Sequence, residues 1–252
     1  MDIKNNKGTE ITNLDSWKNA FLEVDHEIHW KVGRSAYSLA YHFTTPTIDN
    51  SYGLQCIKNS LCELGFHNIE FINAEIEHES KFDCFRNGRI QDIIIWAKNN
   101  NQTIVIGIEA KVDEVFNESI AKAYLEAKNK WKQNPRSNAK ERIEKICSKY
   151  FPDEPIEEID IRYQLLYYLE GTIAEAKKVK GMAYMPILVY HTDDYNDKIG
   201  CKNKSAFEEF MKKMNFCSLK SSLQSTSHYH NKIDGVNVFC SYIEIEKEIK
   251  NI

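Results

Sequence analysis

The alternation of apolar and polar positions is clearest in two neighbouring stretches, residues 88–96 and 102–112. Each predicts a β-strand, because successive side chains on a strand point to opposite faces. On the second strand, every even position from 104 to 112 is apolar. The odd positions hold Val105, Gly107, Glu109 and Lys111. Asp92 lies near the start of the first strand, so charged side chains occur on both strands.

The charges on the second strand are unusual for so hydrophobic a segment. A carboxylate at position 109 and an ammonium group at position 111 are costly to bury unless each has a partner. A metal ion and a phosphate group are suitable partners. This strand pair is therefore the leading candidate for a functional site.

Periodic patterns predict the remaining elements. The predicted helices cover residues 14–24, 36–43, 50–64, 116–131, 139–150, 161–178 and 207–214. The other predicted strands cover residues 69–76, 183–190 and 236–245. Residues 1–13 are polar and are expected to be frayed, and Pro186 indicates an edge position or a bulge for its strand.

The order of these elements predicts an α/β (α+β) fold with an αβββαβ core. Three strands close in sequence favour an antiparallel meander, and the next strand must cross over through a helix. We expect one mixed sheet flanked by helices. An N-terminal helical extension would span residues 1–49, the core residues 50–195 with a helical insert at about 115–150, and a C-terminal helix and strand residues 196–252.

Composition is ordinary for a globular protein, with 42% hydrophobic and 28% charged residues among 252. No apolar run approaches the roughly 20 residues of a membrane span, and the first residues lack the apolar core of a secretory signal. The seven cysteines form no Cys-x-x-Cys pair, which favours a reduced, cytoplasmic protein. A net charge of −4 argues against strong non-specific DNA binding by the whole surface.

Asp92 is followed, after sixteen residues, by Glu109-Ala110-Lys111 on the next strand. This pattern resembles the motif of the PD-(D/E)XK nuclease superfamily, whose fold is restriction-endonuclease-like. Gln91 stands where the motif often has proline, a position that varies in the superfamily. Gln164, on the predicted helix 161–178, is similar to a recurring glutamine of these enzymes.

The resemblance covers roughly residues 30–191. Within it, residues 30–36 (Trp-Lys-Val-Gly-Arg-Ser-Ala) and 171–176 (Gly-Thr-Ile-Ala-Glu-Ala) are similar to an uncharacterised bacterial branch of the superfamily. The resemblance implies a DNA endonuclease of the restriction or defence type that uses Mg²⁺ or Mn²⁺.

The implied chemistry gives each motif residue a role. Mg²⁺ takes one or two carboxylates together with waters and substrate oxygens, which Asp92, Glu109 and the backbone carbonyl of Ala110 would complement. Lys111 would position the attacking water and stabilise negative charge on the phosphorus oxygens. Gln164 would orient a water or contact the substrate backbone, unless it is an ordinary helix-surface amide.

A further acid often completes such a site, and the sequence offers several. Glu63 ends the third predicted helix, at a place where the superfamily often carries an acid. Glu75 and Glu77 precede the meander, and Glu114 follows the motif as a helix-start residue. The sequence does not decide between Glu63, Glu75 and Glu77.

Basic residues predict the surfaces that bind nucleic acid. Arg34 precedes a helix, whose positive end would help it bind a phosphate. In the alternative, Ser35 caps the helix and Arg34 is solvated. The helices near 120–150 carry many bases, among them Lys128, Lys132 and Arg136, which favour contact with DNA. In the alternative, the interleaved acids make these helices a salt-laced solvent face.

Two other functions stay open at this stage. One is a nuclease-like domain without catalysis, which serves as a binding or regulatory module. The other is a restriction subunit that needs a partner chain. Cleavage of both strands ordinarily needs two sites, which favours a homodimer or a partner subunit. The pattern does not separate DNA from RNA.

Overall fold

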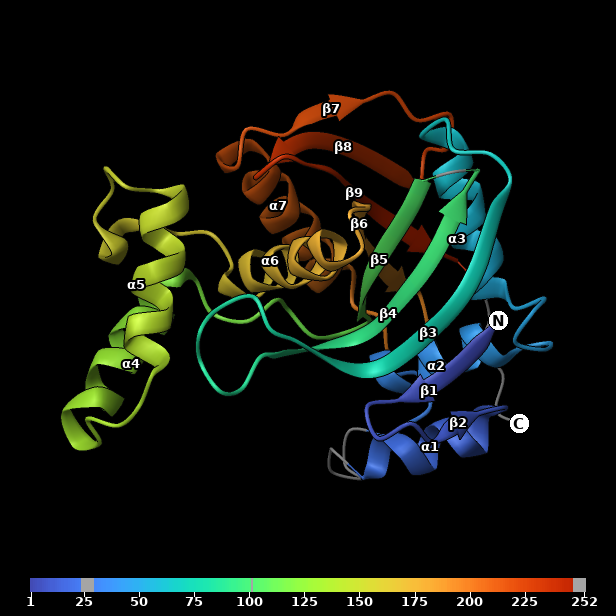
Figure 1. Ribbon diagram of the computed structural model, residues 1–252, viewed down its shortest axis with the longest axis horizontal. Coiled ribbons are helices and arrows are strands. Elements are labelled where there is room, and N and C mark those ends of the chain that lie inside the picture. Colours follow the sequence, from blue (N-terminus) through green and yellow to red (C-terminus); the bar gives the residue numbers. More distant parts are fainter. Residues whose placement is uncertain (24–29, 101, 247–252) are drawn as a thin grey trace.

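A mixed β-sheet forms the centre of the molecule, as a computed structural model that describes residues 1–23, 30–100 and 102–246 shows (Figure 1). Its strands are β1 (Asp2–Asn5), β2 (Glu10–Ile11), β3 (Ile69–Ser80), β4 (Arg89–Asn99), β5 (Gln102–Lys111), β6 (Met182–Tyr190), β7 (Cys217–Leu219), β8 (Thr226–Ile233) and β9 (Val236–Ile245). The α-helices are α1 (Leu14–Leu22), α2 (Ser35–Thr44), α3 (Tyr52–Glu63), α4 (Ile120–Gln133), α5 (Ala139–Tyr150), α6 (Tyr163–Lys178) and α7 (Asp197–Lys213).

The strand order is β2-β1-β3-β4-β5-β6-β9-β8-β7. β3, β4 and β5 pair antiparallel, as predicted for the meander. β6 pairs parallel with β5 after the chain has crossed over through α6, so the predicted crossover is also confirmed. The mixed α/β class is correct, but the described sheet is wider than the predicted core.

Helices cover both faces of the sheet. One apolar cluster joins α1, α2 and α3 to the face that holds Ile104, Ile106 and Ile108. A second cluster joins α6 and α7 to the opposite face, which includes Val105. The predicted division of β5 into two faces is therefore correct. Both faces are buried, so the charged side chains on this strand do not lie on a solvated surface.

Local signals explain where several helices begin. The Asn13 side chain accepts a hydrogen bond from the Ser16 amide at 2.9 Å, and the Ser16 hydroxyl accepts one from the Asn13 amide at 3.0 Å. This reciprocal capping box fixes the start of α1. Val24, predicted at its other end, lies outside the described residues. Ser35 is the first residue of α2, not its cap, because the backbone of Arg34 takes the N-cap position.

Pro186 lies in a central strand, so its predicted edge position is wrong. β6 runs between β5 and β9 and pairs parallel with both. The pairing with β5 is interrupted between Tyr184 and Ile187. A proline has no N–H to donate. Pro186 lies within this interruption, where no backbone hydrogen bond to β5 is needed.

Both ends of the chain add strands that the sequence pattern does not reveal. β1 contains four residues, alternates exposed and buried positions, and extends the sheet by parallel pairing with β3. The N-terminal part is therefore not purely helical, and residues 2–5 are not frayed. At the other end α7 begins ten residues before the predicted start at 207, and β7 and β8 precede the predicted last strand. β8 is rich in polar residues, so its alternation is weak.

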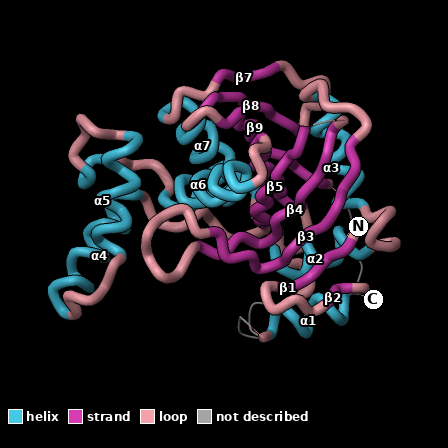
Figure 2. Tube along the Cα trace, in the orientation of Figure 1, coloured by secondary structure: helices cyan, strands magenta, loops and turns pink. Residues whose placement is uncertain are grey.

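α4 and α5 form a helical hairpin, residues 120–150, that stands away from the sheet (Figure 2). We call it the arm. Its base is tied to the body by backbone hydrogen bonds from Ile120 to Ile161 (2.9 Å) and from Tyr163 to Glu118 (3.1 Å). Arg142 on α5 pairs with Asp83 in the β3–β4 loop at 2.5 Å. The two helices predicted for this segment are therefore present. No helix in the described part of the chain combines the length and apolarity needed to cross a bilayer.

His78 ties β3 to α6. Its Nδ1 lies 3.0 Å from Glu75 and its Nε2 lies 3.2 Å from Glu175. Burial would lower the pKa of His78, but the two carboxylates outweigh it and raise the pKa above 6.5. The protonated ring, which forms an ion pair with each carboxylate, is therefore the form that the fold favours.

Replacing His78 by Gln is expected to weaken the pH dependence of stability. A raised folded-state pKa gives stability that is complete below the ordinary value of 6.5 and is lost as the pH rises through the raised value. Urea unfolding between about pH 6 and about pH 9 should show a smaller loss of unfolding free energy in His78→Gln than in the wild type. The exposed His67→Gln is the control. An equal loss of unfolding free energy in the wild type, His78→Gln and His67→Gln would contradict the stabilising role of protonated His78.

Candidate functional site

Three acids line up across the meander. The pairing of β4 with β5 ends at Ile93 and Ile108, and the next residues are Asp92 and Glu109. On β3, the flanking pairs place Glu77 opposite Asp92. The strand register thus brings together carboxylates that are distant in sequence.

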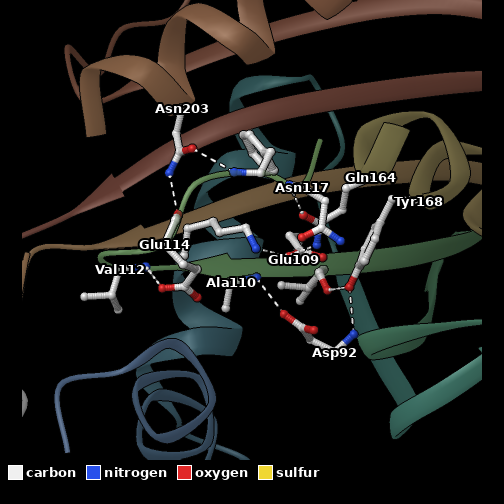
Figure 3. Close-up of polar contacts among 12 residues, drawn as sticks. Asp92, Glu109, Ala110, Val112, Glu114, Asn117, Gln164, Tyr168 and Asn203 are labelled. Carbon is white, nitrogen blue, oxygen red and sulfur yellow. Dashed lines mark hydrogen bonds and ion pairs between the residues drawn. The ribbon is translucent and has the colours of Figure 1, made fainter. Parts of the chain in front are cut away.

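The Tyr168 hydroxyl holds the two motif strands at this point (Figure 3). It accepts a hydrogen bond from the Asp92 amide at 2.7 Å and donates one to the Ile108 carbonyl. The Ala110 amide in turn donates to Asp92 Oδ2 at 2.8 Å. Tyr168 on α6 therefore links the backbones of β4 and β5 beyond their last paired residues. The hydrogen bond from the Ala110 amide fixes the Asp92 side chain against β5.

Glu109 and Lys111 form a buried ion pair. They are 3% and 6% exposed, and Lys111 Nζ lies 2.6 Å from Glu109 Oε1. Gln164 Nε2 donates to the same oxygen at 2.6 Å, and its own Oε1 accepts from the Asn117 amide at 3.2 Å. Among the described residues, Glu109 Oε2 has no hydrogen-bond partner although it is buried. One oxygen of the carboxylate is thus oriented and the other remains available.

The electrostatics of the site are unbalanced. Burial and the nearby charges of Glu109 and Glu77 raise the pKa of Asp92 well above 3.8. Burial also raises the pKa of Glu109, although Lys111 opposes it. Burial would lower the pKa of Lys111, but Glu109, Glu114 and Asp92 outweigh it and raise the pKa. The lysine stays charged, and a further cation would stabilise the carboxylates.

A pocket of about 480 Å³ opens beside Asp92. Glu77 and Glu114 also line it, and Trp17 and Arg34 contribute from the N-terminal part of the chain. Glu114 accepts hydrogen bonds from the Val112 and Asp113 amides and from Ser35. Burial would raise the pKa of Glu114, but Lys111 and these hydrogen bonds lower it. The pocket is large enough for a small polar group and its hydration.

The structure separates the candidates for the further acid. Glu77 lines the pocket with Asp92. Its φ of 49° lies in the left-handed region, which is rare and costly for a residue other than glycine. Such backbone strain is concentrated at functional sites. Glu75, by contrast, pairs with His78.

Glu63 belongs to a different cluster. Its carboxylate lies 3.0 Å from His228 Nε2 and accepts hydrogen bonds from Ser221 at 2.9 Å and from Ser222. Burial opposes ionisation, but these donors lower the pKa of Glu63 to about 2. The structure therefore does not bring Glu63 to the row of acids.

The residues predicted to contact nucleic acid lie in two different parts of the structure. Arg34 lines the pocket, half-exposed, with its guanidinium 2.5 Å from Asp113. Lys128 on the arm pairs with Glu157 at 3.0 Å. Lys132 and Arg136 lie near the end of α4, and no carboxylate pairs with them within the described ranges. Only Arg34 is close to the candidate site.

Asn203 is a site residue that sequence reasoning missed. It is 1% exposed on α7, accepts from the Phe116 amide at 3.1 Å and donates to the Glu114 carbonyl at 3.0 Å. It thus clamps the segment that follows the motif (Figure 3). The available signal was a polar residue one turn before Phe207 on the buried side of α7. The hydrogen-bonding role of Tyr168 was also missed, because its place on the predicted helix indicates a packing residue.

The donor set suits a small hard cation. Asp92, Glu109 and the Ala110 carbonyl offer oxygen atoms, and Mg²⁺ needs few protein ligands. The buried, unpartnered Glu109 Oε2 and the raised pKa of Asp92 both fit a missing positive charge. Over the described ranges, no three His, Cys, Asp or Glu side chains form a ready metal cluster. Waters and substrate oxygens would therefore complete the coordination.

Comparison with known proteins gives a family without an assigned activity. The profile of a family described as a domain of unknown function (DUF6946) matches residues 10–247. The chain belongs to this family. No curated protein and no solved structure matches the chain. The DUF6946 match spans Asp92, Glu109, Lys111, Gln164 and Asn203, so the whole candidate site lies inside the family domain.

Tyr168→Phe is expected to destabilise the protein by about 1–3 kcal/mol, the usual cost of leaving a buried polar group without its partner. The substitution keeps the ring but leaves the Asp92 amide and the Ile108 carbonyl without their hydrogen bonds. Urea unfolding measures the change. Tyr167→Phe is the matched control, because Tyr167 is only partly buried and packs through its ring. If the two variants are equally stable, the hydroxyl does not hold the strands.

Asp92→Asn is expected to stabilise the metal-free protein at neutral pH. Because the folded-state pKa of Asp92 is raised, its charge costs stability above about pH 3.8, and the cost grows as the pH rises. Thermal unfolding in EDTA should give a higher Tm for the variant at pH 7, and the difference should vanish in acid. The exposed Asp153→Asn is the control. A lower Tm for Asp92→Asn than for the wild type would contradict the destabilising effect of the Asp92 charge.

Proposed function

We propose that this protein is a metal-dependent nuclease that hydrolyses phosphodiester bonds in DNA. The observation that carries the proposal is the arrangement of Asp92, Glu109 and Lys111. Two carboxylates meet on adjacent strands, one of them has an unpartnered buried oxygen, and a charged lysine lies beside it. Structural ion pairs rarely leave such an oxygen, because it costs free energy.

The resemblance to the PD-(D/E)XK superfamily supports the proposal. The motif lies on the second and third strands of an antiparallel meander, and a helix leads to a parallel fourth strand. This order agrees with a restriction-endonuclease-like core from α3 to β6. Gln164, the helix residue expected near the site, donates to Glu109 at 2.6 Å.

Each residue has a defined task in the proposed reaction. Asp92, Glu109 and the Ala110 carbonyl would hold Mg²⁺ or Mn²⁺. The ion, when bound, would lower the pKa of a water and neutralise charge on the phosphoryl oxygens. Lys111 keeps its proton and would donate to the attacking water or to a phosphorus oxygen. Gln164 holds Glu109 in one orientation by donating to Oε1, and Oε2 accepts no hydrogen bond from the described residues.

A binding or regulatory module without catalysis is the second candidate. It is favoured by the occupation of Glu109 Oε1 by both Lys111 and Gln164. Calorimetry with Mn²⁺ separates the two functions. The nuclease should take up Mn²⁺ through Glu109, so that Glu109→Gln loses the binding. A module that takes up no metal would favour the second candidate.

Activity tests the proposal directly. The purified chain should nick or cut plasmid DNA with Mg²⁺ and stop with EDTA. Asp92→Ala and Lys111→Ala should each lower the rate by at least about 10²-fold, the usual loss when one electrostatic partner of a transition state is removed. The same assay with RNA establishes which nucleic acid is cut.

Matched variants guard this test against unfolding. Asp153→Ala and Lys122→Ala remove the same charges from exposed positions and should cut like the wild type. Circular dichroism should show that all variants are folded. Wild-type cleavage by both Asp92→Ala and Lys111→Ala would refute the assignment.

A further inference from the structure

The arm is built on a rigid apolar base. Tyr124 and Ala127 on α4 pack with Ile143 and Ile146 on α5 in the same core cluster that includes α6. A 14-residue helix extends about 21 Å at 1.5 Å per residue. The far end of the arm is therefore held well beyond the body of the protein.

Most cations along the arm are neutralised by acids. The ion pairs are Lys122–Glu118 (2.7 Å), Lys128–Glu157 (3.0 Å), Lys140–Glu144 (2.9 Å), Arg142–Asp83 (2.5 Å), Lys145–Glu141 (2.7 Å) and Lys149–Glu170 (2.7 Å). These pairs form the salt-laced face that the interleaved charges predict. They leave little positive potential near the base of the arm.

The far end of the arm, residues 129–138, is different, and we call it the arm tip. Its sequence is Asn-Lys-Trp-Lys-Gln-Asn-Pro-Arg-Ser-Asn, without an acid. Every residue from 129 to 136 is exposed, and Trp131 is 44% exposed. Lys130, Lys132 and Arg136 have no ion pair with any described residue. Three uncompensated cations and an exposed indole thus gather on a protein whose net charge is −4.

We propose that the arm tip binds the phosphate backbone of DNA. The choice of ligand rests on the proposed nuclease function and on charge complementarity. Cations that contact phosphates release condensed counterions, which favours binding. The exposed Trp131, whose ring centroid lies 5.3 Å from Lys140 Nζ, adds apolar surface beside these cations. A solvated surface that served solubility alone would mix both signs of charge, as the base of the arm does.

The position of the arm gives the contact a defined distance from the site. The arm begins next to the catalytic segment, where the Asn117 amide donates to Gln164 at 3.2 Å and Lys111 Nζ lies 5.5 Å from the Phe116 ring. Duplex DNA rises about 3.4 Å per base pair, so an arm of about 21 Å reaches phosphates about six base pairs away. The tip would anchor the flank of the substrate while the site acts on one phosphodiester.

Binding without cleavage tests the proposal. Fluorescence anisotropy with a labelled duplex of about 20 base pairs, in EDTA, is measured over a range of salt concentrations. The tip variant carries Lys130→Gln, Lys132→Gln and Arg136→Gln. Its affinity should fall, and the slope of log K against log salt should become shallower by about 2–3, because each lost phosphate contact contributes about 0.9.

The control variant carries Lys122→Gln, Lys128→Gln and Lys145→Gln. It removes the same charge from the same arm, but from residues already paired with Glu118, Glu157 and Glu141. Its slope should change by less than about 1. Wild-type binding by the tip variant, or an equal loss in the control variant, would overturn the proposal.

Cleavage by the same proteins separates this proposal from the proposed function. The tip variant should raise KM for a duplex with about nine flanking base pairs and leave kcat unchanged, while Asp92→Ala should keep the binding and lose the cleavage. If Asp92→Ala and Lys111→Ala both cut like the wild type, the nuclease assignment fails, and the anisotropy result decides the tip alone. If the tip variant binds and cuts like the wild type, the tip proposal fails and the nuclease assignment stands.

Discussion

The Lys111–Glu109 ion pair is the constraint on which the site depends. It lies in a strand whose two faces are both buried, where a charge without partners is strongly disfavoured. Lys111 stays protonated because three carboxylates surround it, whereas burial raises the pKa of Glu109 and Lys111 only partly opposes this effect. Asp92 adds a charge that this pair does not neutralise. The site therefore has an excess of negative charge that a bound cation would neutralise.

Distant elements hold this arrangement in place. α6 supplies Tyr168 to the backbones of β4 and β5, and Gln164 to the carboxylate of Glu109. α7 supplies Asn203 to the segment after the motif. His78 joins β3 to α6 through two acids. Each contact uses a polar side chain that is itself buried or half-buried, so the surrounding fold fixes the position of the charges with little freedom.

The sequence predicts the centre of the molecule better than its margins. β5 is easily recognised because both of its faces are buried, so its sequence is an almost continuous apolar run in which Glu109 and Lys111 stand out. Strand adjacency then brings Asp92 beside them. Glu77 and Asn203 could not be chosen, because their roles come from strand register and from the packing of α7. β1 and β8 were missed because pairing with neighbouring strands, not their own apolar pattern, makes them strands.

The distribution of charge links the candidate site to the arm. A row of acids repels a phosphate backbone, and an overall charge of −4 does not help association. Positive charge must then come from elsewhere. Arg34 is already paired with Asp113, and the base of the arm is neutralised by its own acids. Among the described residues of the arm, Lys130, Lys132 and Arg136 at its tip have no ion pair, about one helix length from the motif. An acidic centre for a metal and a remote basic tip for the backbone can coexist because a rigid helical hairpin keeps them apart.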